Sequence, residues 1–97
     1  SMNRRKLEDI EVGLGSVGRL RILRKLIRNP DGYFTKYALE QATGIKPVAV
    51  RSDLKVLVDL DWVKEFPHEP KTYRINMENE VVKHIAEFFR KISSGDR

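Results

Sequence analysis

The sequence predicts a mainly α-helical fold that carries one small β-hairpin. Three observations lead to this prediction. Apolar residues recur at helical spacing over several separate segments, and glycine or proline lies between most of these segments. Two short runs of strand-forming residues, 62–66 and 72–75, are joined by the proline-rich segment 67–71. The 97 residues include no cysteine, which excludes disulfides and thiolate-bound zinc, and the chain is long enough to bury one core without them.

Up to five helices are expected, the first of them either a short helix or an arm, and polar or flexible residues mark where most of them begin and end. The predicted ranges are 3–12, 17–28, 36–43, 47–60 and 77–93. Ser16, Thr35 and Asn76 precede three of these segments, where their side chains can accept from the free amides of the first turn. Gly44 ends the third segment in the left-handed conformation, which glycine adopts without strain. Pro47 opens the fourth, at a position whose amide needs no partner.

The chain is interpreted as one domain with additions at both ends. Residues 1–15 are expected to form an N-terminal arm or short helix, and residues 16–76 the domain itself. Residues 77–93 form the predicted C-terminal helix, and residues 94–97 a tail.

The segment from Leu39 to Leu57 has the pattern of two helices joined by a tight turn. It reads LEQATGIKPVAVRSDLKVL, with apolar residues on the inward side of both helices. A turn this short lets the second helix cross the first at a steep angle. Such a crossing is what a helix-turn-helix needs to place its second helix in the DNA major groove.

The order of helices, tight turn and hairpin resembles the winged helix-turn-helix regulators of the ArsR/MarR type, particularly the small archaeal ones. Residues 39–45 resemble their second helix and turn, 50–63 their recognition helix running into the first wing strand, and 73–75 the return strand. The C-terminal helix matches the dimerisation helix of the family in position. The sequence departs from the family at Glu40, where alanine is usual, and at Asp61, which replaces a glycine before the wing. Aspartate tolerates the left-handed backbone that such a glycine adopts.

This resemblance implies a transcriptional regulator that binds double-stranded DNA. The recognition helix would enter the major groove, and the wing would lie on the backbone or in the minor groove. On a helical wheel Val48, Ser52 and Lys55 fall within about 60°, opposite the core stripe. The candidate DNA-binding residues of this helix are Lys46, Val48, Ala49, Arg51, Ser52 and Lys55. The candidate flanking contacts are Lys36, Lys64, Lys71 and Arg74.

The last predicted helix carries an apolar stripe that is wider than one small domain needs. A pair of exposed phenylalanines would be unfavourable for a monomer. We therefore expect a homodimer with a two-fold seam. The expected seam residues are Val82, Ile85, Phe88, Phe89 and Ile92.

Charge favours a polyanionic partner but does not place it on the recognition helix. There are 19 lysines and arginines against 14 acidic residues, a formal net charge of +5. Residues 46–61 nevertheless hold three basic and three acidic side chains. The densest basic stripe lies on the helix over 17–28 and consists of Arg21, Arg24, Lys25 and Arg28. This stripe supports an alternative function, a winged-helix protein–protein interaction module in a transcription or replication assembly that binds an acidic partner.

Neither catalysis nor metal binding is predicted. His68 and His84 are the two histidines, no Ser-His-Asp arrangement is supported, and no glycine-rich phosphate loop occurs. We expect no enzyme activity, cofactor or metal. No apolar run approaches the roughly 18 residues of a membrane span, and no signal-peptide pattern opens the chain. A cytoplasmic protein without membrane contact is therefore expected.

Overall fold

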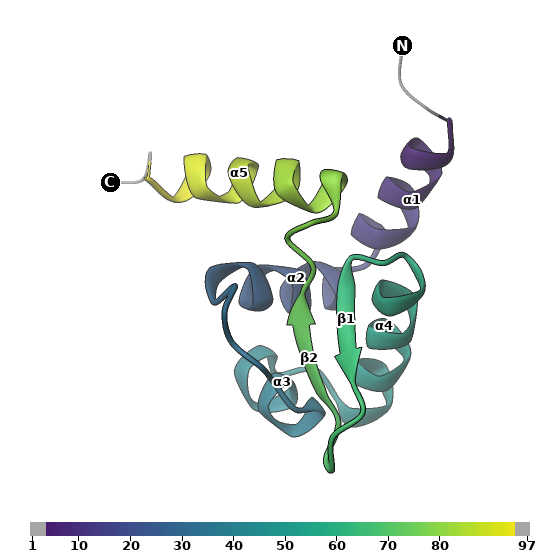
Figure 1. Cartoon of the computed structure of the whole chain (residues 1–97), viewed down its shortest axis with the longest axis vertical. Helices are drawn as coiled ribbons and strands as arrows, with labels where there is room; N and C mark the ends of the chain where they lie inside the picture. The colour runs from purple at the N-terminus through teal and green to yellow at the C-terminus, as the bar shows by residue number, and fades with distance from the viewer. Residues whose placement is uncertain (1–3, 95–97) are drawn as a thin grey trace.

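The computed structural model describes residues 4–94, which form five helices and one antiparallel two-stranded hairpin (Figure 1). This architecture confirms the predicted mainly α fold with a small β-hairpin. The elements in chain order are α1 (Arg4–Leu14), α2 (Val17–Arg28), α3 (Lys36–Thr43), α4 (Pro47–Asp59), β1 (Val63–Phe66), β2 (Thr72–Ile75) and α5 (Glu80–Ser94). Of the predicted tail, Ser94 is the last residue of α5, and residues 95–97 lie outside the described part.

The centre of the molecule is a group of three helices with the hairpin beside it. Helices α2, α3 and α4 pack against one another, β1 contacts α4, and β2 contacts α2. Phe34 adds a third, single-residue strand position, because its backbone exchanges hydrogen bonds of 2.9 and 2.7 Å with Tyr73. The fully buried side chains include Ile22, Leu23, Leu26, Leu39, Val50, Leu54, Leu57 and Trp62.

Of the three predicted N-cap residues, two are confirmed and one is wrong. Ser16 accepts from the amide of Arg19 at 3.2 Å, and Thr35 accepts in the same way at the start of α3. Asn76 does not cap the last helix. That helix begins at Glu80, and Asn79 is its cap, because the Asn79 side chain accepts from the amides of the second and third helical residues.

Asn76 instead fixes the start of the hairpin. Its side chain is buried and donates to the carbonyl of Asp61 at 2.8 Å. Asp61 has a φ of 65°, so it does adopt the left-handed backbone expected at this position. The chain turns here from α4 into β1.

Helix α1 runs through Gly13 to Leu14, two residues beyond the end of the predicted segment 3–12. The reason is a close approach. A Cβ atom at Gly13 would lie 2.1 Å from a ring carbon of Trp62, so only glycine lets the end of α1 pack on this indole. The N-terminal segment is therefore a helix and not an arm, at least from Arg4 onward.

Helices α1 and α5 lie at the end of the molecule that is opposite the hairpin tip (Figure 1). Helix α5 extends away from the three central helices, and its first half supplies the buried side chains of Val82, Ile85 and Ala86. Within residues 4–94, none of the helices combines the length and apolarity required to cross a lipid bilayer.

Candidate nucleic-acid interface

The corner between α3 and α4 sets the direction of the second helix. Gly44 has a φ of 74°, as predicted, and its amide donates to Glu40 at 2.9 Å. Thr43 adds two bonds through its hydroxyl, which donates to the Leu39 carbonyl and accepts from the Ile45 amide. Two short helices therefore meet at a sharp, well-bonded turn, as a helix-turn-helix requires.

Helix α4 has one buried and one exposed face. Val50, Leu54 and Leu57 are in the core, whereas Val48 is 68% exposed. The other predicted recognition-helix residues follow the same division. Ala49 is half-buried, and the exposed ones are Lys46, Arg51, Ser52 and Lys55. The structure thus brings the six predicted residues together along the outer side and the N-terminal end of one helix.

Asp53 is the polar exception on the inner face of α4. It is buried, and its carboxylate lies 3.1 Å from the guanidinium of Arg19 on α2. Gly18 makes room for this carboxylate, because a Cβ atom there would lie 2.3 Å from it. In the sequence, Asp53 is one of the three acidic residues between positions 46 and 61. Its spacing from the buried Val50 and Leu57 was the available signal that it faces inward.

A groove of about 360 Å³ lies between the outer side of α4 and the hairpin. Arg51 and Lys55 lie along one wall, and Glu65 and Tyr73 along the other. The Tyr73 hydroxyl donates to the Glu65 carboxylate at 2.7 Å. Burial of the phenol, and after it this bond and the charge of Glu65, raise the pKa of Tyr73, so the phenol stays protonated. Lys36 reaches the same groove, with its ammonium 5.9 Å from the centre of the Tyr73 ring.

Two of the predicted flanking cations lie on the other face of the hairpin. Lys64 and Arg74 are paired across the strands, and alternate residues of a strand point to opposite faces, so they turn away from the groove at α4. Lys64 lies 3.4 Å from Glu78. Arg74 lies 3.2 Å from Asp31 and also donates to Pro30 and Tyr33. Lys64 and Arg74 therefore do not line the groove beside α4, and their role as flanking DNA contacts stays a prediction.

Lys71, another of the predicted flanking residues, and Tyr37 both have exposed side chains. Lys71 is exposed between the two strands near the hairpin tip. Tyr37 follows Lys36 in the first turn of α3 and is 67% exposed. Tyr37 is not among the candidate DNA-binding residues predicted from the sequence. The available signal was its place beside Lys36 at the start of the helix that precedes the predicted recognition helix.

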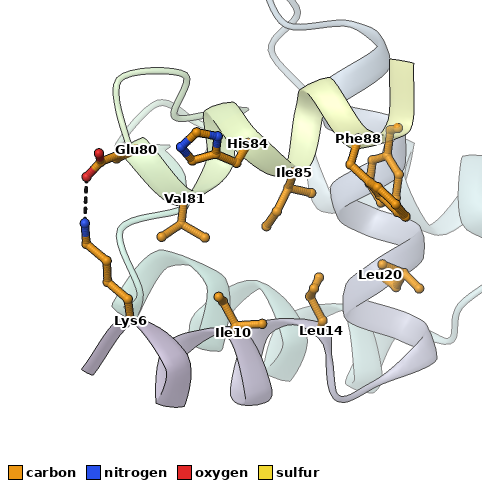
Figure 2. A pocket seen from close by; sticks show the side chains of 10 residues that line it. Lys6, Ile10, Leu14, Leu20, Glu80, Val81, His84, Ile85 and Phe88 are labelled. Atoms are coloured by element: carbon orange, nitrogen blue, oxygen red, sulfur yellow. Dashed lines mark hydrogen bonds and ion pairs between the residues drawn. The ribbon is translucent and has the colours of Figure 1, made fainter. Parts of the chain in front are cut away.

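A second, apolar groove lies between α1 and α5 (Figure 2). It has a volume of about 660 Å³. Its walls carry Ile10 and Leu14 from α1 and Ile85 and Phe88 from α5. An ion pair of 2.6 Å between Lys6 and Glu80 lies at one end, and this bond lowers the pKa of the Glu80 carboxyl.

The predicted seam residues divide around this groove. Ile85, Phe88 and Phe89 line the groove, and of these Phe88 is 59% exposed. Ile92 is 56% exposed and does not line it. Val82 is fully buried within its own chain. It cannot contact a second subunit without unpacking the core, so its assignment to the seam is wrong.

Three solved structures share this arrangement, and together with the geometry above they define the class of the protein. It is a winged helix-turn-helix protein, with α3 and α4 as the helix-turn-helix and the hairpin as the wing. The transcriptional repressor BigR from Xylella fastidiosa superposes with a TM-score of 0.71 at 21% identity, over 94% of this chain and 96% of its own. The crystal structure of an ArsR family transcriptional regulator superposes over 100% of this chain and 98% of its own, with a TM-score of 0.68 at 17% identity.

The third structure is a homodimer. It is the winged helix-turn-helix DNA-binding domain of a possible ArsR-family transcriptional regulator from Mycobacterium bovis, determined by solution NMR. Its TM-score is 0.69 at 20% identity, over 97% of this chain and 88% of its own. No protein-family model matches the sequence, and no curated protein matches it. The likeness to MarR regulators and the archaeal origin stay predictions.

Proposed function

We propose that this protein is a transcriptional regulator that binds double-stranded DNA as a homodimer, with α4 in the major groove and the hairpin against the backbone. The observation that carries the proposal is the outer side of α4. Arg51, Ser52 and Lys55 project into solvent beside the hairpin, while the opposite side of the same helix builds the core. A helix held in this way is suited to reading base edges.

Three exposed side chains of α4 have a chemical match in the major groove. Arg51 and Lys55 can donate to guanine O6 and N7, and Val48 can contact a thymine methyl. Lys55 lies 3.5 Å from Asp59, but both side chains are largely exposed, so this weak pair can open to release the lysine. Lys46 precedes a helix start with no side-chain cap, which leaves the amides that follow Pro47 free for a phosphate.

The backbone contacts come from α3 and the hairpin tip in this proposal. Lys36 and Tyr37 occupy the first turn of α3, and Lys71 lies near the tip. Lysine and tyrosine side chains commonly donate to phosphate oxygens. Glu65 faces the same groove with a negative charge, and its hydrogen bond to Tyr73 holds it against the hairpin wall.

The groove between α1 and α5 is the proposed seam of the homodimer. Its apolar lining continues onto the exposed side chains of Phe88 and Ile92, which a second copy would cover. The homodimeric state of the Mycobacterium bovis domain, which has the same fold, supports this assignment. A two-fold dimer would present two recognition helices to half-sites about 34 Å apart.

The test is selection of bound duplexes from random DNA at controlled salt. The proposal predicts an enriched palindrome whose half-sites lie about one helical turn apart. Recovery of duplexes without any shared sequence would contradict it. Binding that is lost uniformly as salt rises, without sequence preference, would also contradict it, because phosphate contacts alone behave in this way.

A further inference from the structure

The densest group of positive side chains lies on α2 and not on the recognition helix. We refer to it as the basic face of α2, and its members are Arg21, Arg24, Lys25 and Arg28. Their spacing places them along two helical turns, over about 10 Å. Together with Ala42 and Thr43 at the end of α3, they line a depression of about 310 Å³.

Within residues 4–94, no carboxylate forms an ion pair with any of these four side chains. Lys25 has its ammonium 5.7 Å from the centre of the Phe34 ring, a cation–π contact that leaves its charge uncompensated. By contrast, Lys55, Lys64 and Arg74 each have a carboxylate within 3.5 Å.

The spacing of the basic face is unfavourable for an isolated helix. Neighbours three and four residues apart are all positive, as in the pairs Arg21–Arg24 and Arg24–Arg28. Like charges at these spacings repel one another across the helix surface. A bound polyanion would remove this repulsion.

The basic face points away from the proposed DNA surface. Helices α2, α3 and α4 pack against one another, so the exposed side of each is opposite a shared core. Arg19 on the inner side of α2 meets Asp53 on the inner side of α4, which places the outer sides of the two helices apart. A straight duplex on the outer side of α4 would therefore leave the basic face of α2 uncovered.

We infer that the basic face of α2 is a docking surface for an acidic segment of another protein, separate from the DNA surface. The segment would carry several carboxylates spread over about 10 Å. Arginine favours such a partner, because its guanidinium can bind a carboxylate through two parallel hydrogen bonds. Three of the four side chains are arginines, and the depression beside α3 can hold part of the segment.

The test measures two ligands against matched variants of the full chain. The first ligand is a fluorescent oligoglutamate of about ten residues, which spans the basic face when extended. The second is the duplex enriched by selection, or a mixed-sequence duplex if none is enriched. Arg24→Ala/Arg28→Ala removes two charges from the basic face. Lys83→Ala/Arg90→Ala removes two charges from the side of α5 that does not line the apolar groove.

The expected result is oligoglutamate binding that is at least about tenfold weaker for Arg24→Ala/Arg28→Ala and within about twofold of wild type for the α5 variant. Duplex affinity should stay within about threefold of wild type for both. Arg21→Ala/Lys25→Ala repeats the test with the other half of the basic face, and a thermal melt verifies that each variant is folded.

Three results would overturn the inference. Equal losses in the two matched variants would mean that oligoglutamate senses net charge alone. No loss in any variant would mean that the basic face binds no acidic segment. A tenfold loss of duplex binding in the α2 variants would assign the basic face to the DNA backbone. None of these results depends on whether the duplex carries a specific sequence.

Discussion

Arg19 of α2 lies 3.1 Å from Asp53 on the inner side of α4. The same guanidinium donates to the carbonyl of Val12 in α1 at 2.9 Å. One side chain thus joins α4 to α1, the helix that forms a wall of the apolar groove. In the proposed homodimer, Arg19 would link the subunit seam to α4, the helix proposed to read DNA.

Removing the buried partner of this pair should destabilise the fold. For Asp53→Ala we expect a loss of about 2–3 kcal/mol in the free energy of unfolding, because Arg19 is left partly buried without its carboxylate. Lys55→Ala is the matched control on the same helix. It breaks an exposed pair and should cost less than about 0.5 kcal/mol. Urea unfolding measures both, and equal losses in the two variants would contradict a structural role for the Arg19–Asp53 pair.

Gly13→Ala tests the close approach of α1 to Trp62. The added methyl group would meet the indole at 2.1 Å, and we expect a loss of about 2 kcal/mol or more together with a changed tryptophan fluorescence. Gly44→Ala is the comparison, because nothing lies within 4 Å of its Cβ position. It should cost about 1 kcal/mol through its positive φ alone. A Gly13→Ala protein as stable as wild type would show that α1 does not pack on Trp62.

Phe88→Glu tests the proposed seam. The side chain is 59% exposed in one chain, so a charge there is tolerated by the fold but not by an apolar interface. Sedimentation should report twice the mass of one chain for wild type and the mass of a single chain for Phe88→Glu. Lys83→Glu, on another side of α5, should remain dimeric. A wild-type monomer at high concentration would refute the seam.

The raised pKa of Tyr73 predicts how the free energy of unfolding changes at alkaline pH. Burial and the bond to Glu65 raise the pKa of its phenol above the ordinary value of 10.0. The folded state therefore favours the protonated form. Its contribution is fully present below about pH 10 and is lost as the pH rises towards the folded pKa. Urea midpoints between about pH 8 and 11 should fall less steeply for Tyr73→Phe than for wild type.

Tyr37→Phe is the control for this pH series, because its phenol is largely exposed. Its midpoints should fall with the wild-type slope. A wild-type slope in Tyr73→Phe would mean that another group causes the alkaline loss.

Features set by neighbouring residues were predictable from the sequence. Hydrophobic spacing located α2 and α3 at their observed bounds, and Ser16 and Thr35 cap them as predicted. Gly44 has the backbone conformation that a tight turn demands. Each of these depends on residues within about one helical turn, so a single sequence contains the information.

Features set by distant partners were not predictable in the same way. Gly13 reads as a helix breaker until Trp62 is seen against it. Asp53 reads as a surface charge until Arg19 is in place. Val82 reads as a seam residue until the core that surrounds it is known.

The directions of the candidate DNA-binding side chains were only partly predictable from the sequence. The outward direction of Arg51 and Lys55 follows from helical geometry alone. The direction of Lys64 and Arg74 depends on which face of the hairpin meets α4, and this is a tertiary contact.

The central claim is that the outer side of α4 reads DNA sequence, and the ratio of specific to nonspecific affinity tests it most directly. The measurement compares the selected duplex with a scrambled duplex at one salt concentration for Arg51→Ala/Lys55→Ala and for the charge-matched Lys83→Ala/Arg90→Ala. We predict that the ratio falls at least about tenfold in the first variant, because one base contact is worth about 1–3 kcal/mol, and stays near wild type in the second. An unchanged ratio in Arg51→Ala/Lys55→Ala would contradict the account.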